Sequence, residues 1–159
     1  MKMSNIPLDA IDLIEQFEGF KANAYPDPVT GWKLPTIGFG TTHYPDGRPV
    51  NKGDIISKDE ATDCLFHHIE NLCTPALEKI PYWDKMNDNQ KSALYSFAYN
   101  LGAGFYKHAN FDSITNVCDS PARWNDSAWI HEQFGKYTNH GLPGLLKRRK
   151  AEADLFCKV

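Results

Sequence analysis

Several features that would place this chain in a special class of protein are missing from its sequence. No apolar run approaches the roughly 20 residues that a membrane span needs, and residues 1–7 lack the uninterrupted apolar stretch of a secretory signal. The four cysteines form no C-x-x-C pair and no zinc-ribbon spacing, so we expect reduced cysteines in the core. These absences predict a soluble protein that is made in a cytoplasm.

A large excess of charge of one sign is missing as well. The formal net charge is −3, which gives no reason to expect nucleic acid or an anionic membrane as a partner. The charges are nevertheless uneven, because residues 1–90 carry 8 Lys and Arg against 14 Asp and Glu, whereas residues 91–159 carry 9 against 6. With 42% hydrophobic residues, the chain can bury one core. We expect a single domain over residues 1–159, built as two lobes that differ in charge.

Proline and glycine divide the chain into parts of different character. Residues 6–18 carry apolar side chains at helical spacing, and Gly19 is a natural helix stop. From about residue 20 to 53, prolines and glycines separate short apolar pieces, which is typical of a small, irregular antiparallel sheet. We therefore predict an α+β fold with a β-lobe at about 20–53 and a helical lobe at about 54–159 plus the N-terminal helix. A cleft between two such lobes is a usual place for a ligand.

Capping residues and apolar spacing define the helices that we predict in the second lobe. A capping box over residues 57–60 opens a long helix that Pro75 should kink or divide. The remaining helices are expected at about residues 88–101, 112–118, 121–134 and from 143 onward. Ser120 is the predicted cap of the third of these. The last helix is expected to bury Leu145, Leu146, Leu155 and Phe156.

Two carboxyl groups and a threonine gather where the first helix should meet the sheet. Glu18 ends the helix beside the apolar side chains of Phe17 and Phe20, and burial of this kind favours the protonated form that a general acid needs. Asp27 lies in a proline-rich turn and is expected to be exposed and ionised, and Thr36 follows on the next strand. Two carboxyl groups in different environments suit glycoside hydrolysis. Glutamates at helix ends and aspartates in such turns also occur without any catalytic role.

Sequence motifs along nearly the whole chain resemble one enzyme family. The motifs Glu-Gly-Phe at 18–20, Ala-Tyr-Pro-Asp at 24–27 and Thr-Ile-Gly-Phe-Gly-Thr at 36–41 are similar to the active-site strip of phage-type lysozymes and endolysins, glycoside hydrolase family 24. Residues 96–102 resemble the central helix of that family, and residues 144–152 resemble its closing helix. The resemblance implies the lysozyme-like fold, with the active site in the cleft between the two lobes.

The resemblance also implies catalytic roles for three residues. Glu18 would protonate the glycosidic oxygen, Asp27 would hold or activate the attacking water, and Thr36 would help to position that water. An inverting outcome is the usual chemistry of the family, and it requires carboxyl groups on the order of 6.5–9.5 Å apart. The sequence departs from the family in two ways: the interval between Asp27 and Thr36 is longer than usual, so the hairpin must be enlarged, and Gly40 is followed by Thr41 rather than by histidine.

Aromatic and basic residues are further candidates for the site. Trp32 on the enlarged hairpin, and Phe105 and Tyr106 after a glycine-rich turn, could stack on sugar rings. Arg148 is also a candidate substrate-binding residue, and either Arg148 or Arg149 could pair with the catalytic glutamate and orient it. Alternatively, Arg148 pairs with the glutamate one turn further on, at position 152, and the cluster is a solvated face.

A metal centre is not expected. Cys64, His67 and His68 fall within one helical turn, but adjacent histidines on a helix point in different directions. Neither of the two Gly-x-Gly stretches, at 38–40 and at 102–104, completes a phosphate-binding motif. We therefore expect no metal and no cofactor.

These observations together predict a peptidoglycan hydrolase. By the resemblance, the chain would cleave the β-1,4 bond between N-acetylmuramic acid and N-acetylglucosamine. It would act as a monomer that accumulates in the host cytoplasm and reaches the wall through holes made by a holin. Three alternatives remain: a lytic transglycosylase, which needs only the acid; a non-catalytic wall-binding phage structural protein; and a chitin-directed hydrolase of related fold. Turbidity loss and product analysis distinguish them.

Overall fold

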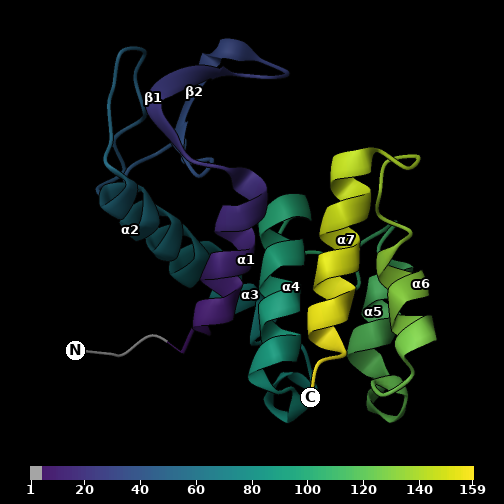
Figure 1. The fold of residues 1–159 in the computed structure, drawn as a ribbon. Helices are drawn as coiled ribbons and strands as arrows, with labels where there is room; N and C mark the ends of the chain where they lie inside the picture. Colours follow the sequence, from purple (N-terminus) through teal and green to yellow (C-terminus); the bar gives the residue numbers. More distant parts are fainter. Residues whose placement is uncertain (1–4) are drawn as a thin grey trace.

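The computed structural model describes residues 5–159. Residues 1–4, and with them most of the segment on which we predict no secretory signal, lie outside the described part. In chain order the elements are α1 (Leu8–Glu18), β1 (Lys21–Asp27), β2 (Gly31–Gly38), α2 (Lys58–His68), a π-helical turn (Ile69–Cys73), α3 (Thr74–Leu77), a 3₁₀ turn (Trp83–Lys85), α4 (Asp88–Leu101), α5 (Asp112–Asp119), a second 3₁₀ turn (Pro121–Arg123), α6 (Ser127–Phe134) and α7 (Pro143–Phe156). The chain is α+β, as predicted (Figure 1). Among residues 5–159, no helix is both long enough and apolar enough to cross a membrane.

The first helix and the hairpin that follows it are joined by a very short connection. Helix α1 ends where the N–H of Gly19 donates to the carbonyl of Glu15, 3.1 Å away, and strand β1 begins two residues later. The strands β1 and β2 are antiparallel and pair Tyr25 with Thr36, with an irregularity on either side of that pair. The predicted sheet is thus limited to one hairpin, because residues 39–57 contribute only isolated bridges.

The long helix after the hairpin is divided, as the proline in its sequence suggests. Helix α2 begins with the predicted capping box, in which the Ser57 hydroxyl accepts from the N–H of Glu60. Its continuation is a π-helical turn over Ile69–Cys73, and Pro75 lies in the first turn of α3. Proline has no N–H to donate to the carbonyl four residues before it. The helix is therefore missing one hydrogen bond at Pro75, and the wider π-helical turn lies at this point.

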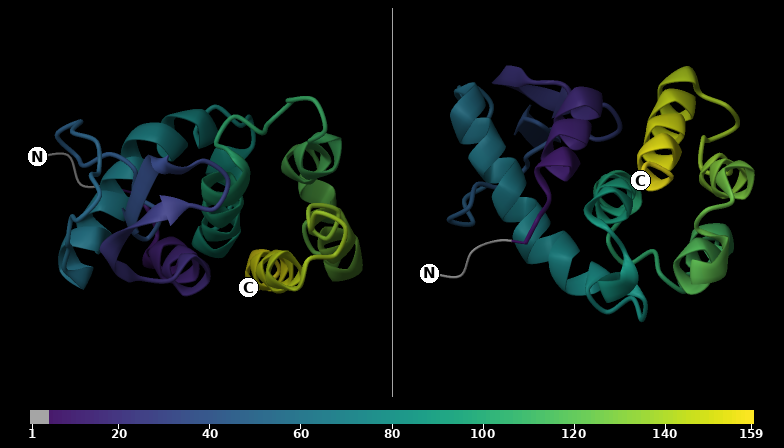
Figure 2. Two further views of the ribbon diagram at one scale, coloured as in Figure 1. Left: turned by 90° about the horizontal axis from the view of Figure 1, so that it is seen from above. Right: turned by 60° about the horizontal axis from the view of Figure 1, so that its bottom comes forward.

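The helical body is built around α4. Helices α1 and α7 both pack on α4, and α6 packs on the other side of α7 (Figures 1 and 2). The predicted range of α4 is confirmed, with Asn87 and Gln90 forming its capping box. The predicted helix at 121–134 is wrong in its start: Pro121–Arg123 is a 3₁₀ turn, and α6 begins only at Ser127. The cap of α6 is the Asp126 carboxylate, which accepts from the N–H of Trp129 at 3.1 Å, whereas the Ser120 side chain caps nothing.

The buried face of α7 differs from the prediction. Leu146 is 49% exposed and Leu145 and Leu155 are only half-buried, while Phe156 is in the core as expected. Three of the buried positions are instead charged: Arg148, Arg149 and Glu152 are 4%, 1% and 0% exposed. Apolar spacing placed leucines inward because it cannot foresee that charged side chains will be buried as an internally paired group.

The end of β2 packs closely on α2, and this contact predicts the effect of one substitution. Gly38 has φ +66°, and a Cβ added there would lie 2.9 Å from the Cβ of Ala61. Gly31 has the same φ but no heavy atom within 4 Å of its Cβ position. Replacing Gly31 with Ala should therefore cost only the backbone strain, about 1–2 kcal/mol, and Gly38→Ala should cost about 2–4 kcal/mol because the clash is added. Urea denaturation of the two variants measures the difference, and equal losses would contradict the contact.

Candidate active site

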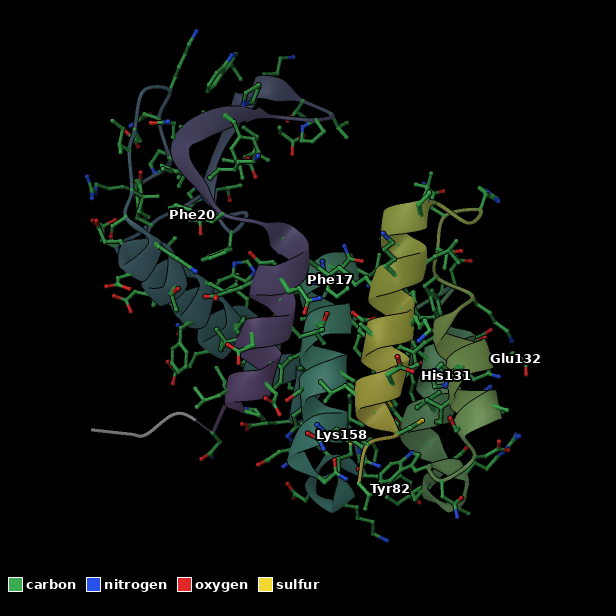
Figure 3. All side chains as sticks on the ribbon, viewed as in Figure 1. Phe17, Phe20, Tyr82, His131, Glu132 and Lys158 are labelled. Carbon is green, nitrogen blue, oxygen red and sulfur yellow. The ribbon has the colours of Figure 1, made fainter. Side chains whose placement is uncertain are left out.

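Glu18 is the last residue of α1 and is held by a residue from the far end of the chain. Its Oε2 accepts a hydrogen bond from Arg148 Nη1 at 2.5 Å. The Glu18 side chain remains 22% exposed, whereas that of Arg148 is only 5% exposed. The guanidinium carbon of Arg148 also lies 5.8 Å from the centre of the Phe17 ring, which Figure 3 places at the end of α1 that faces α7. The solvent-facing carboxyl thus rests on a buried cation.

The second oxygen of Glu18 faces a wall made by a glycine and a tyrosine. A Cβ at Gly40, where φ is +93°, would lie 3.4 Å from Glu18 Oε1 and 3.2 Å from the Tyr99 hydroxyl. That hydroxyl donates to the carbonyl of Phe39 at 2.6 Å. Burial and the negative charge of Glu18 raise the pKa of Tyr99, so it stays protonated and remains a donor. Tyr99 belongs to the central-helix motif, but its place in the site was not predicted from the sequence.

Asp27 lies at the end of β1 and is fixed by its own turn. Its Oδ2 accepts three hydrogen bonds, from the N–H groups of Val29 and Thr30 at 2.9 Å each and from the Thr30 hydroxyl at 3.1 Å. These donors lower the pKa of Asp27, the N–H of Thr30 most strongly, so the group is ionised at neutral pH. Oδ1 accepts no hydrogen bond from the described residues and is available to a ligand or water.

Tyr25 and Thr36 face each other across the hairpin between the two carboxyl-bearing segments. Thr36 is 6% exposed, and its hydroxyl donates to the carbonyl of Leu34 at 3.1 Å, which leaves its lone pairs free to accept. Burial raises the pKa of Tyr25, and the charges of Glu18 and Asp27 raise it further. Tyr25 therefore lies within the field of both carboxylates. Sequence reasoning missed Tyr25, because the pairing of β1 with β2 is irregular between Tyr25 and Asp27 and simple strand alternation does not apply there.

The three aromatic candidates have different environments. Trp32 is 42% exposed on the hairpin, and Lys52 Nζ lies 4.9 Å from the centre of its ring. Phe105 is only 2% exposed and packs edge-on against Phe97, so we correct its assignment from the sugar-binding surface to the core. Tyr106 is half-buried, and its hydroxyl donates to Asp119 at 2.6 Å.

The choice between the two neighbouring arginines is resolved by the packing of α7 on α4. Arg148 contacts Glu18, whereas Arg149 Nη2 donates to Asn100 at 2.7 Å and to Glu152 at 3.1 Å. The alternative of a solvated face is wrong, since both arginines and Glu152 are buried. Arg148 is also too deeply buried to be a surface contact for substrate, so its place in the site is beneath Glu18.

The four cysteines lie in the core or against it, as expected from the sequence. All four are free; Cys64, Cys73 and Cys118 are buried, and Cys157 is half-buried. Across residues 5–159, no group of three or more His, Cys, Asp or Glu side chains is arranged to hold a metal ion. His68 instead packs its ring edge-on against Tyr99, 5.2 Å between ring centres, and burial lowers the pKa of His68.

Comparison with solved structures defines the class of fold. The chain superimposes on an endolysin from Escherichia coli O157:H7 phage FAHEc1 with a TM-score of 0.72 and 27% sequence identity, covering 98% of this chain and 93% of that one. The α+β fold is therefore lysozyme-like. The chain belongs to the phage lysozyme family, because its residues 15–152 match the family model described as "Phage lysozyme".

Relatives of known sequence agree with the family but differ in length. An endolysin of Acyrthosiphon pisum secondary endosymbiont phage 1 is 33% identical over 149 residues, which cover 91% of this chain and 92% of that protein. An endolysin of Bacillus phage B103 is 33% identical over 152 residues, which cover 96% of this chain but 54% of that protein. The chain thus spans nearly all of one relative and about half of the other.

The turn that fixes Asp27 predicts a measurable titration. Because its donors lower the pKa of Asp27 below the unfolded value, the stability they contribute is present above the unfolded pKa and is lost as the pH falls through the folded pKa. Thr30→Val removes the hydroxyl donor and keeps the N–H, so the pKa of Asp27 should rise but stay below its ordinary value. ¹³C NMR of the carboxyl carbon measures this, with Asp46, held by Arg48, as the internal control. A wild-type Asp27 that titrates at or above its ordinary pKa would be inconsistent with the turn.

Proposed function

We propose that this chain is a peptidoglycan hydrolase of glycoside hydrolase family 24, an endolysin-type muramidase that cleaves the β-1,4 bond between N-acetylmuramic acid and N-acetylglucosamine. The observation that carries the proposal is the pair of unlike carboxyl groups: Glu18 rests on Arg148, and Asp27 is ionised at the end of the adjoining strand. Membership of the phage lysozyme family supports the same reaction. The glycan would lie between a β-lobe at about 20–53 and a helical lobe at about 54–159 plus the N-terminal helix.

In this mechanism the two carboxyl groups divide the proton transfers. Arg148 occupies Glu18 Oε2, so Oε1 is the oxygen that carries the proton to the glycosidic oxygen. A water molecule held by the free Oδ1 of Asp27 attacks the anomeric carbon as the bond to the leaving oxygen breaks, and Asp27 accepts the proton that the water loses. Thr36 assists by accepting a hydrogen bond from that water. Attack by water on the face opposite the leaving group gives inversion.

Substrate contact is proposed for the exposed part of the hairpin. Trp32 offers an aromatic surface, and the ammonium group of Lys52 beside it adds positive charge. Sugar rings stack on aromatic side chains, and the bacterial wall carries anionic groups that a lysine attracts. Tyr106 is retained as a weaker second contact, because its hydroxyl is already bonded to Asp119.

The cellular setting is also part of the proposal. The chain would act as a monomer without a cofactor, accumulate in the host cytoplasm and reach the wall through holes made by a holin. The names of its relatives support an endolysin that is used in host lysis.

The acid assignment predicts the effect of one isosteric substitution. Glu18→Gln keeps an acceptor for Arg148 but cannot supply a proton, so turbidity loss of outer-membrane-permeabilised bacteria should fall at least about 100-fold. Glu132→Gln is the matched control, because Glu132 is exposed on α6, away from α1, the helix that Glu18 ends (Figure 3). Both proteins should keep the wild-type circular dichroism spectrum. Clearing by Glu18→Gln at the wild-type rate would place the acid elsewhere.

The base assignment is tested by the reaction product. Asp27→Asn should reduce hydrolysis of soluble peptidoglycan fragments by about 100-fold or more, because the amide cannot accept the proton from water. Mass spectrometry of the wild-type product should show addition of water and a reducing end. An anhydro-muramic product, formed at an undiminished rate by Asp27→Asn, would establish the transglycosylase alternative instead. Binding without any cleavage by the wild type would favour a wall-binding protein.

A further inference from the structure

The charged group between α4 and α7 is unusual for the middle of a helical body. Arg148, Arg149 and Glu152 occupy the face of α7 that a leucine-rich stripe would normally fill, and the Glu152 side chain has no exposed area. Burying ionised groups is costly unless they are paired and hydrogen-bonded. The burial of these charges therefore depends on their pairing with one another and with neighbouring groups.

Ser96 on α4 is the contact through which this group orients Arg148. The Ser96 hydroxyl donates to Glu152 Oε2 at 2.6 Å and accepts from Arg148 Nε at 3.2 Å. The carbonyl of the same residue accepts from Arg148 Nη2 at 3.2 Å. Two of the three nitrogens of the guanidinium are thus fixed on one residue of α4.

The planarity of the guanidinium turns this anchoring into a direction. With Nε and Nη2 bound to Ser96, the remaining nitrogen, Nη1, can point only along the plane away from that residue. It is this nitrogen that donates to Glu18 Oε2. Glu152 lies 3.5 Å from Arg148 Nε as well, so its charge also balances the buried cation.

Arg149 completes the surroundings of Glu152. Its Nε lies 2.8 Å from Glu152 Oε1, its Nη2 donates to Oε2 at 3.1 Å, and its guanidinium carbon lies 4.9 Å from the centre of the Phe97 ring. Burial raises the pKa of Glu152, whereas Arg149, Ser96 and Arg148 act in the opposite direction. The carboxyl group is consequently held from several sides at once.

We propose that Glu152 is a positioning residue for the acid Glu18: through Ser96 it fixes the orientation of Arg148, and Arg148 fixes the carboxyl group. The Glu152 side chain has no exposed area, so it cannot act on substrate directly. The effect on catalysis, though not the effect on Arg148, rests on the proposed hydrolase function. Loss of Glu152 should slow the reaction by misplacing Glu18 and should leave substrate binding nearly unchanged.

Kinetics of an isosteric variant test the catalytic part. Glu152→Gln should lower kcat on soluble peptidoglycan fragments by about 10- to 100-fold, as a displacement of about 1 Å does, with KM within about twofold. Asp154→Asn is the matched control on the same helix: it breaks the exposed contacts of Asp154 with His131 and Lys150 and should leave kcat unchanged. Lowered thermal stability of Glu152→Gln with wild-type kcat and KM would reduce Glu152 to a structural role.

A measurement on Arg148 itself does not depend on any activity. In protein labelled with ¹⁵N-arginine, the Nε–H of Arg148 should exchange slowly with water in the wild type and in Asp154→Asn, and at least about 10-fold faster in Glu152→Gln. Equally slow exchange in Glu152→Gln would overturn the proposal even if the wild type cleaved peptidoglycan. Conversely, if the wild type fails to cleave the wall but Glu152→Gln still speeds the exchange of the Arg148 Nε–H, only the proposed function is refuted.

Ser96→Ala serves if Glu152→Gln does not fold. This variant keeps the charges of Glu152 and both arginines and removes only the hydroxyl that joins Glu152 to Arg148. We expect faster Nε–H exchange of Arg148 and a kcat about 3- to 10-fold lower, with little change in KM. Unchanged exchange and unchanged kcat in Ser96→Ala would overturn the proposal.

Discussion

The ion pair between Arg148 and Glu18 connects parts of the chain that are 130 positions apart, and the geometry of the candidate site depends on it. The pair can form only when α1 and α7 have both packed on α4, since α4 supplies the contacts that hold the arginine. A correctly placed acid is therefore a property of the assembled helical body. No local segment of the sequence could present Glu18 in this way by itself.

The second carboxyl group follows the opposite principle. Asp27 receives all of its hydrogen bonds from residues two and three positions further along the chain. Its orientation is set within the hairpin and needs no other part of the protein. The position of Glu18 thus depends on long-range packing, and that of Asp27 depends on a single turn. Changes in the helical body should therefore affect Glu18, and changes in the hairpin should affect Asp27.

Local signals account for the parts of the fold that the sequence predicts well. The range 88–101 is correct because a capping pair and a terminal glycine mark both of its ends. The predicted start of α6 is wrong because Ser120 is the cap that the sequence predicts, whereas the side chain that accepts from an N–H of its first turn is that of Asp126. Sequence spacing likewise cannot decide between Arg148 and Arg149. They are successive residues on one helix, and the position of α4 determines which of them turns toward Glu18.

The sequence predicts those candidate site residues that belong to recognisable motifs, and it does not predict those whose place depends on packing. Glu18, Asp27 and Thr36 belong to motifs that resemble those of the phage lysozyme family. These motifs can be read from the sequence without knowing how the side chains pack. Tyr25 and Tyr99 belong to the same motifs, but their places in the site depend on the irregular pairing of β1 with β2 and on the close approach of Gly40 to Tyr99. The burial of Glu152 had no sequence signal, because a charged residue on a helix is normally exposed.

In the turn after Asp27, Val29 contributes through its backbone N–H and not through its side chain. Val29 is 91% exposed, yet its N–H holds Asp27 Oδ2. Any amino acid with a backbone N–H can make that bond, and only proline cannot. Position 29 is thus a suitable attachment point for a dye, a cross-linker or a library of side chains. It lies just beyond the strand that carries Asp27, and changing its side chain should leave the Asp27 carboxylate in place.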